Sequence, residues 1–467
     1  LATGGKMMKQ LLIQNGIIVD HENTFRGDIL IENGIIRQVG TSICPRSNAE
    51  VYNATGMLVM PGIVDPHVQV EVLYGKFPMT DDFDTGTIAA AAGGVTTIID
   101  FADQAHGIPA YEFLKRRRAT ADGRVNIDYT LHMSLTDTNV PCVEDMQKVV
   151  ESGITSFKLY MTYSKRDRMV NEGQMMDIMT EAARINAICG IHGENDNYVE
   201  YMTKKLLAEG KCGLEYFTTA RPAINEAIAV TTAIAIAEYT GCILYVHHCS
   251  CARTLHAIQE GRRRGAKIYC ETCPCYLNLT EDVYRQENAE LFVVNPALRT
   301  AADNQALWDG ICNGDVDTLG TDHCSYTKEQ KFRNKGDFSA IPAGHPGVEI
   351  SLPLMYTTGV VSGKISVNRL IELMSYNPAR IFGLAQKGRL TPGCDADVVI
   401  FDPQHKWTMS ADKLLMNVDF TNYDGMQMTG SVKATFLRGE KLYEDGVFCG
   451  THHMGRYVPA KPAPFYR

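Results

Sequence analysis

Residue types that could bind a metal ion occur at the ends of several short apolar runs. These runs have the length and composition of buried strands, as in PGIVDPHVQVEV at residues 61–72 and SFKLYM at residues 156–161. Imidazole and carboxylate are the ligands that zinc and similar ions prefer in proteins. The candidate ligands are His67, Gln69, Lys158, His192, His248 and Asp322. A fold that brings these strand ends together would form a metal site.

The pair His67 and Gln69 has the spacing at which two side chains leave one face of a strand. Two histidines there could bind one ion together, but the second residue is an amide. Its carbonyl oxygen is a neutral and poor zinc ligand compared with imidazole. The motif alone is compatible with a metal site that has a substituted ligand, with the remnant of one, or with no site.

Lys158 lies in a run that is expected to be buried on both faces of a strand. An unpaired buried ammonium is very costly, so the lysine must find a carboxylate or lose its charge. A neutral amine can take up carbon dioxide and become a carbamate, whose two oxygens can bridge two cations. The spacing leaves both possibilities open.

Strand-like runs alternate with helical patterns through the middle of the chain. Eight buried strands that alternate with helices predict parallel pairing, and eight is the number that closes a (β/α)8 barrel of the TIM type. A doubly wound open sheet is the second possibility, but its glycine-rich nucleotide fingerprint is absent. Functional groups in such a barrel gather at the carboxyl ends of the strands. The candidate ligands occupy those ends.

The two ends of the chain are predicted to be antiparallel β-structure. Asn-Gly pairs at residues 15–16 and 33–34 are typical of hairpin turns. The tail carries three aromatic residues without periodicity, and it is either a disordered end or an arm that packs on a neighbouring subunit. The expected units are residues 7–60 and 386–450 as two parts of a β-sandwich, 61–385 as the barrel and 451–467 as the arm.

Composition excludes several classes of partner. A net charge of -9 argues against nucleic acid or an anionic membrane as the main partner, and no apolar run approaches the ~20 residues of a membrane helix. Fourteen cysteines, mostly in apolar runs, indicate a reducing compartment and a cytoplasmic protein. Three of them stand in CETCPCY at residues 270–276, where no second pair follows, and they are expected to pack in the core.

Five separated motifs resemble those of the cyclic amidohydrolases, the dihydropyrimidinases and hydantoinases. The motifs are PG-x-x-D-x-H, FKLYMTY, IHGEND, YVHHCS and GTDHC, and the resemblance extends over nearly the whole chain. It implies a barrel with a β-sandwich built from both termini, assembled as a homotetramer. It also implies a centre of two metal ions, commonly zinc, and a small cyclic amide substrate opened by metal-activated water.

The resemblance assigns roles to individual residues. His67 and Asp322 would bind the first metal, and His192 and His248 the second, with carboxylated Lys158 bridging the two. Asp322 would also transfer the proton. Tyr163 would stabilise the oxyanion. Strand alternation allows only one of the adjacent residues His247 and His248 to face the barrel interior, and the resemblance selects His248.

Three departures from the family pattern affect the expected function. Gln69 replaces a histidine, so we expect a weakened first metal site and an occupied second one. Asn295 stands where serine is usual in a substrate-contact loop, and Ala343 replaces an asparagine that touches the substrate ring. Because of these two replacements, the identity of the cyclic amide substrate is not determined by the resemblance.

Two further expectations concern the substrate and the class of protein. Tyr74 and Phe77, in the loop after the first strand, are expected to select the ring substituent. Some relatives, similar to the collapsin-response mediators, have lost ligands and act as oligomeric interaction proteins. Such a role is the alternative here, but the retained Lys158 and Asp322 favour catalysis.

Overall fold

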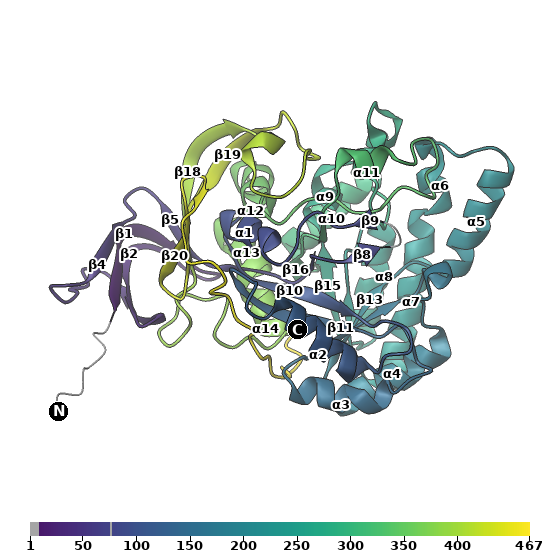
Figure 1. The fold of residues 1–467 in the computed structure, drawn as a ribbon, viewed down its shortest axis with the longest axis horizontal. Helices are drawn as coiled ribbons and strands as arrows, with labels where there is room; N and C mark the ends of the chain where they lie inside the picture. Colours follow the sequence, from purple (N-terminus) through teal and green to yellow (C-terminus); the bar gives the residue numbers. More distant parts are fainter. Residues whose placement is uncertain (1–8, 75–76) are drawn as a thin grey trace.

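The computed structural model describes residues 9–74 and 77–467, without the side chains of Leu73 and Tyr74. Eight parallel strands form the centre of the molecule (Figure 1). Their residues are almost all buried, because one face meets the barrel interior and the other meets the helices. In spatial order the strands are β6 (Ile63–Asp65), β10 (Val95–Asp103), β11 (Asp128–Ser134), β12 (Ser156–Tyr160), β13 (Ile188–His192), β14 (Ile243–Val246), β15 (Ile268–Thr272) and β16 (Thr318–Leu319).

A short ladder joins the first and last strands of this sheet. β7 (Val68–Gln69) pairs in parallel with β17 (His323–Cys324) directly beyond the ends of β6 and β16. Thr321 adds two hydrogen bonds to the Asp65 carboxylate, one from its backbone N–H (3.1 Å) and one from its hydroxyl (2.6 Å). These contacts close the barrel, and the predicted (β/α)8 architecture is confirmed.

Helices cover the outside of the barrel (Figure 1). Among the described helices, none has both the length and the apolar composition needed to cross a bilayer. The helices are α1 (Thr85–Ala92), α2 (Ala110–Ala121), α3 (Val143–Glu151), α4 (Glu172–Arg184), α5 (Asp196–Ala208), α6 (Phe217–Ala220), α7 (Ala223–Thr240), α8 (Ala252–Arg263), α9 (Pro274–Asn278), α10 (Ala301–Asn313), α11 (Lys328–Phe332), α12 (Ser351–Met355), α13 (Val367–Ile371) and α14 (Asn377–Ile381).

Both ends of the chain contribute to one nine-stranded sheet beside the barrel (Figure 1). β5, from the N-terminal part, lies between two strands. It pairs with β1 of the same part on one side and with β18 of the C-terminal part on the other. Apolar residues from the two parts pack in one cluster, including Ile18 and Ile400. The strands are β1 (Gln10–Val19), β2 (Thr24–Glu32), β3 (Ile35–Gly40), β4 (Glu50–Asn53), β5 (Leu58–Pro61), β18 (Val398–Thr408), β19 (Gln427–Leu437), β20 (Glu440–Glu444) and β21 (Val447–Phe448).

The two Asn-Gly pairs have different structures. Asn33 and Gly34 form the predicted turn between β2 and β3, both with positive φ. The turn predicted at Asn15 and Gly16 is wrong, because both residues lie inside β1, where the pairing with β2 shifts register. Asn15 has a φ of 64°, and a Cβ on Gly16 would lie 2.3 Å from the Val59 side chain. The pair therefore forms a bulge in β1 opposite β2, and the missing side chain of Gly16 leaves room for Val59 of β5.

The C-terminal segment, residues 451–467, packs on the barrel of its own chain. The backbone of Tyr129 in β11 accepts a hydrogen bond from Val458 N–H and donates one to the Arg456 carbonyl. Near the end of the chain, the Phe465 and Tyr466 rings lie 4.9 and 5.4 Å from the ring of Tyr269 in β15. The segment is therefore ordered along the barrel, and its predicted packing on a neighbouring subunit stays a prediction.

Candidate metal centre

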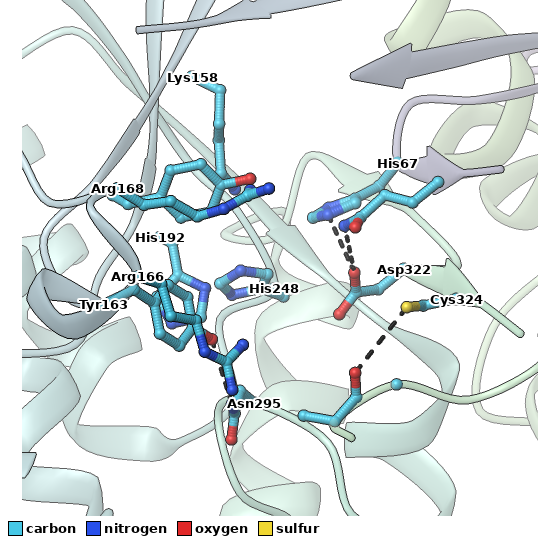
Figure 2. Close-up of a pocket in the computed structure, with 14 residues that line it drawn as sticks. His67, Lys158, Tyr163, Arg166, Arg168, His192, His248, Asn295, Asp322 and Cys324 are labelled. Atoms are coloured by element: carbon cyan, nitrogen blue, oxygen red, sulfur yellow. Dashed lines mark hydrogen bonds and ion pairs between the residues drawn. The ribbon is translucent and has the colours of Figure 1, made fainter. Parts of the chain in front are cut away.

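A cavity opens at the carboxyl ends of the barrel strands, where the sequence placed the candidate ligands (Figure 2). It brings together side chains from opposite sides of the barrel, because successive parallel strands end at the same rim. Cys324 and Gly344 also line it, as do the charged side chains of Arg166 and Arg168. The predicted site residues that line it are His67, Gln69, Lys158, Tyr163, His192, His248, Asn295 and Asp322, together with Ala343.

His67 lies between two carboxylates. Its Nδ1 is 2.6 Å from Glu271 Oε1, and its Nε2 is 3.0 Å from Asp322 Oδ1. Burial alone would lower the pKa of His67, but Glu271 and Asp322 outweigh it and raise the pKa to about 9. Burial favours a neutral Asp322, yet His67 outweighs burial, so the pKa of Asp322 lies below its ordinary value. The two side chains stabilise each other's charge.

Gln69 contacts the same carboxylate more weakly. Its Nε2 is 3.4 Å from Asp322 Oδ1, so the amide presents a donor to Asp322. A histidine at this position would offer a ring nitrogen to a metal ion, whereas the Gln69 amide nitrogen cannot coordinate one. The structure places Gln69 in the centre but gives it no strong ligand atom.

Lys158 is buried in the barrel, at 2% exposure. Within residues 9–74 and 77–467, no acidic group lies within ion-pair distance of its Nζ, which is 5.4 Å from the centre of the Phe101 ring. Burial lowers the pKa of Lys158 to about 8, although Glu271 and Asp322 oppose the shift. Of the two possibilities that the sequence left open, pairing with a neighbouring carboxylate is therefore not observed.

His192 is held by a charged pair behind it. Its Nε2 is 2.8 Å from Glu194 Oε2, which also accepts a hydrogen bond from Arg221 Nη1 (2.5 Å). Burial lowers the pKa of His192 even though Glu194 opposes the shift. A neutral imidazole whose Nε2 is already bonded has its Nδ1 left as a ligand atom.

His247 and His248 both point into the barrel, contrary to the prediction that only one would. The ring centre of His247 is 4.8 Å from that of His67, and the ring centre of His248 is 5.4 Å from it. A φ of 41° at His248 takes it out of the alternating strand geometry just beyond β14. Of the two, His248 lines the cavity and His247 lies buried behind it.

Tyr163 and Asn295 face the ligands from one side of the cavity (Figure 2). Asn295 Nδ2 donates a hydrogen bond to Tyr163 Oη at 3.1 Å, so the phenol proton is free to point elsewhere. Tyr163 has a φ of 72° at the start of the turn that follows β12. Burial raises the pKa of Tyr163, although Arg221 opposes the shift, so the phenol stays protonated near neutral pH.

Phe77 lies further from the ligands. It packs against the cluster formed by Met79, Cys324 and Tyr326, of which only Cys324 lines the cavity. The side chain of Tyr74 lies outside the described residues, so its predicted role stays a prediction.

Glu271 is the residue that the sequence reasoning missed. It accepts hydrogen bonds from Tyr245 Oη (2.9 Å) and His248 N–H (3.0 Å) in addition to its contact with His67. It also belongs, with His67 and His247, to a buried group whose possible ligand atoms all lie within 4.8 Å of one another. Because Glu271 is fully buried and engaged by three partners, we interpret it as the group that orients His67 rather than as a ligand. The motif CETCPCY drew attention to its cysteines, which are buried in the core as expected.

Glu271→Gln should weaken divalent metal binding by about 10–100-fold, the usual cost of losing a partner that orients a ligand. The neutral amide keeps the size of the side chain but removes the charge that holds His67. Competition with a chromogenic chelator measures the change, and Glu287→Gln on the exposed surface is the matched control. Equal affinity in both variants would show that Glu271 does not support the centre.

The donor set suits a divalent metal ion. Three imidazoles and one carboxylate line a single cavity, and the buried Lys158 amine beside them lacks a carboxylate partner in the described part of the chain. Oxygen and imidazole nitrogen donors in this number are typical of zinc and related ions.

Comparisons with known proteins identify the family of the chain. Residues 58–442 match the amidohydrolase family. A D-hydantoinase from Geobacillus stearothermophilus is 37% identical over 452 residues, which cover 96% of each protein. A dihydropyrimidinase from Brevibacillus agri has a TM-score of 0.95 at 34% identity, covering 97% of this chain and 99% of that one. An L-hydantoinase from Arthrobacter aurescens has a TM-score of 0.90 at 28% identity, covering 97% and 100%. The resemblance inferred from the motifs is confirmed, and the chain belongs to the amidohydrolase family.

Proposed function

We propose that this protein is a metal-dependent hydrolase that opens the ring of a cyclic amide or imide of the hydantoin or dihydropyrimidine type. The observation that carries the proposal is the convergence of His67, Lys158, His192, His248 and Asp322 on one cavity. The activities named for relatives that align over nearly the whole chain support the substrate class.

We propose zinc as the metal, with Lys158 carboxylated. His67 and Asp322 would hold one ion and His192 and His248 the other, each together with Lys158. The buried amine forms no ion pair with a carboxylate of the described residues, which supports the modification. When bound, such an ion polarises the ring carbonyl and brings the pKa of a water molecule near neutrality.

The chain's own residues supply proton transfer and positioning. Asp322 accepts a proton from the attacking water and later delivers it to the ring nitrogen as the C–N bond breaks. The product is a single open-chain molecule that carries the new carboxylic acid at one end of the broken bond and the released N–H at the other. Tyr163 keeps its proton and donates a hydrogen bond from its phenol O–H to the negatively charged oxygen of the tetrahedral intermediate, while its Oη accepts a hydrogen bond from Asn295.

The decisive experiment combines metal analysis with turnover. Purified protein loaded with zinc is tested on hydantoin, dihydrouracil and 5-substituted hydantoins, while its metal content is measured. We expect ring opening of at least one of these together with bound metal. No ring opening of any of them, with only traces of metal, would overturn the proposal.

Gln69→His should raise the metal content from about one to about two zinc ions per subunit, because it restores an imidazole beside Asp322. Elemental analysis after dialysis measures the ratio. Gln38→His on the exposed face of β3 is the matched control for an added histidine. A ratio of two in the unaltered protein, or no gain in the variant, would show that Gln69 does not limit occupancy.

We further propose a cytoplasmic homotetramer. All fourteen cysteines are free, which supports a reducing compartment. Light scattering coupled to size exclusion tests the assembly. A monomer would remove this part of the proposal without affecting the chemistry.

A further inference from the structure

A second cavity adjoins the metal centre on the side of Tyr163. Its volume is about 290 Å³, compared with about 70 Å³ for the cavity at the ligands. The two share four lining residues: Tyr163, Arg166, Asn295 and Ala343. At this junction Ala343 contributes only a methyl group. A substrate whose ring occupies the small cavity could therefore extend a substituent into the larger one.

The positively charged side chains around this second cavity differ in whether a carboxylate neutralises them. Lys165 forms an ion pair with Glu200, and Arg221 forms one with Glu194. Arg166, in contrast, has no carboxylate within ion-pair distance anywhere in the described ranges, residues 9–74 and 77–467. Glu200 is the carboxylate in the cavity lining, and Lys165 already neutralises it. The cavity therefore carries an uncompensated positive charge within a protein of net charge -9.

The backbone fixes Arg166 at the junction. It ends the short 3-10 helix η1 (Ser164–Arg166), between Tyr163 and Asp167, which have φ values of 72° and 53°. The Arg166 guanidinium lies 5.2 Å from the centre of the Tyr163 ring. Figure 2 shows the side chain extending from the Tyr163 side of the site toward Asn295. This charge thus faces both cavities, next to the residues assigned to the substrate.

We infer that the second cavity binds an anionic substituent on the substrate ring, with Arg166 as its partner. The inference rests on the proposed function and narrows it to cyclic amides that carry a carboxylate side chain. Guanidinium binds carboxylate through two parallel hydrogen bonds, which neither a neutral amide nor an alkyl group can reproduce. Arg166 acts here as a residue that determines specificity.

The test compares two hydantoins of the same shape. 5-(2-Carboxyethyl)hydantoin carries the anion, and 5-(2-carbamoylethyl)hydantoin replaces it with a neutral amide. We expect the unaltered protein to favour the acid by about tenfold in kcat/KM, mainly through KM, as for one charge-assisted hydrogen bond. In Arg166→Leu the ratio should fall to about one, and in Arg166→Lys it should be partly retained. Because each ratio is measured on one preparation, differences in folding or metal content cancel.

Arg26→Leu is the matched control, since Arg26 is exposed on β2 in the nine-stranded sheet. It should keep the ratio of the unaltered protein. A ratio of one or less in the unaltered protein, or an unchanged ratio in Arg166→Leu, would overturn the inference while ring opening upholds the proposed function. If neither of these two compounds is opened, hydantoin, dihydrouracil and the other 5-substituted hydantoins still decide the proposed function, and calorimetry of both compounds decides the subsite. The inference is supported if the unaltered protein binds the acid more tightly than the amide and Arg166→Leu loses this preference. Equal binding of the two compounds by the unaltered protein overturns it.

Discussion

Asp322→Asn should lower kcat/KM for ring opening by about 10²–10⁴-fold, the range expected when a positioned proton-transfer group is removed. Asp322 lies 3.0 Å from His67 Nε2, and this neighbour keeps the pKa of Asp322 below its ordinary value although burial opposes it. The carboxylate is therefore ionised at neutral pH and can accept a proton. An asparagine amide of the same size cannot.

Steady-state kinetics on the best substrate measure this loss, with metal content determined on the same sample. Asp309→Asn, on the exposed face of α10, is the matched control and should keep full activity. Equal turnover in Asp322→Asn and the unaltered protein would exclude Asp322 as the proton acceptor. If the zinc-loaded unaltered protein has no turnover while both proteins keep the same oligomer and partners, the molecule is instead an oligomeric interaction protein.

The site was predictable wherever strand position alone determines where a side chain lies. Lys158 and His192 lie on parallel barrel strands, so reading the ends of the apolar runs was enough to place them at one rim. Gln69 was found for the same reason. The family resemblance then supplied Tyr163, whose place depends on a turn with positive φ that periodicity does not reveal.

Features that depend on contacts between segments far apart in the sequence were not predictable. Glu271 meets His67 only because barrel closure brings the end of β15 near the segment that follows β6, although the two residues are 204 positions apart in sequence. The positive φ of His248 breaks the alternation of strand side chains, so its ring points into the barrel like that of His247. Arg166 can be identified as the uncompensated charge only from the ion pairs that neutralise Lys165 and Arg221. Local patterns carry none of this information.

Lys387→Met should lower the free energy of unfolding by about 3–5 kcal/mol, the usual cost of leaving buried charges without their partner. Lys387 is 1% exposed, and its Nζ lies 2.5, 2.9 and 2.7 Å from carboxylate oxygens of Asp128, Asp395 and Asp397. Asp128 begins barrel strand β11, whereas the other two precede β18 of the nine-stranded sheet. The ammonium thus joins the two parts of the molecule. Burial alone would lower its pKa, but the three carboxylates outweigh burial and raise it.

The pH dependence of the loss gives a second, independent check. The pKa of Asp128 is lowered in the folded protein, since Lys387 and Arg438 outweigh burial, so its stabilising contribution is present above the ordinary carboxyl pKa and is lost as pH falls. In Lys387→Met the orphaned carboxylates take up protons more readily, and the difference from the unaltered protein should shrink from pH 7 toward pH 5. Urea denaturation at both pH values measures it.

Lys433→Met is the matched control, because Lys433 pairs with Asp445 on the exposed surface of the same sheet. Removing this pair should change stability by no more than about 1 kcal/mol. Asp397→Asn added to Lys387→Met should recover part of the loss, since one buried charge fewer then lacks a partner. A loss in Lys387→Met as small as that of the control would mean that apolar packing between the barrel and the nine-stranded sheet, for example by Val95 and Val399, holds the two parts together without the buried charges. Full loss with no recovery in the double variant would place the cost in the missing lysine chain rather than in the uncompensated carboxylates.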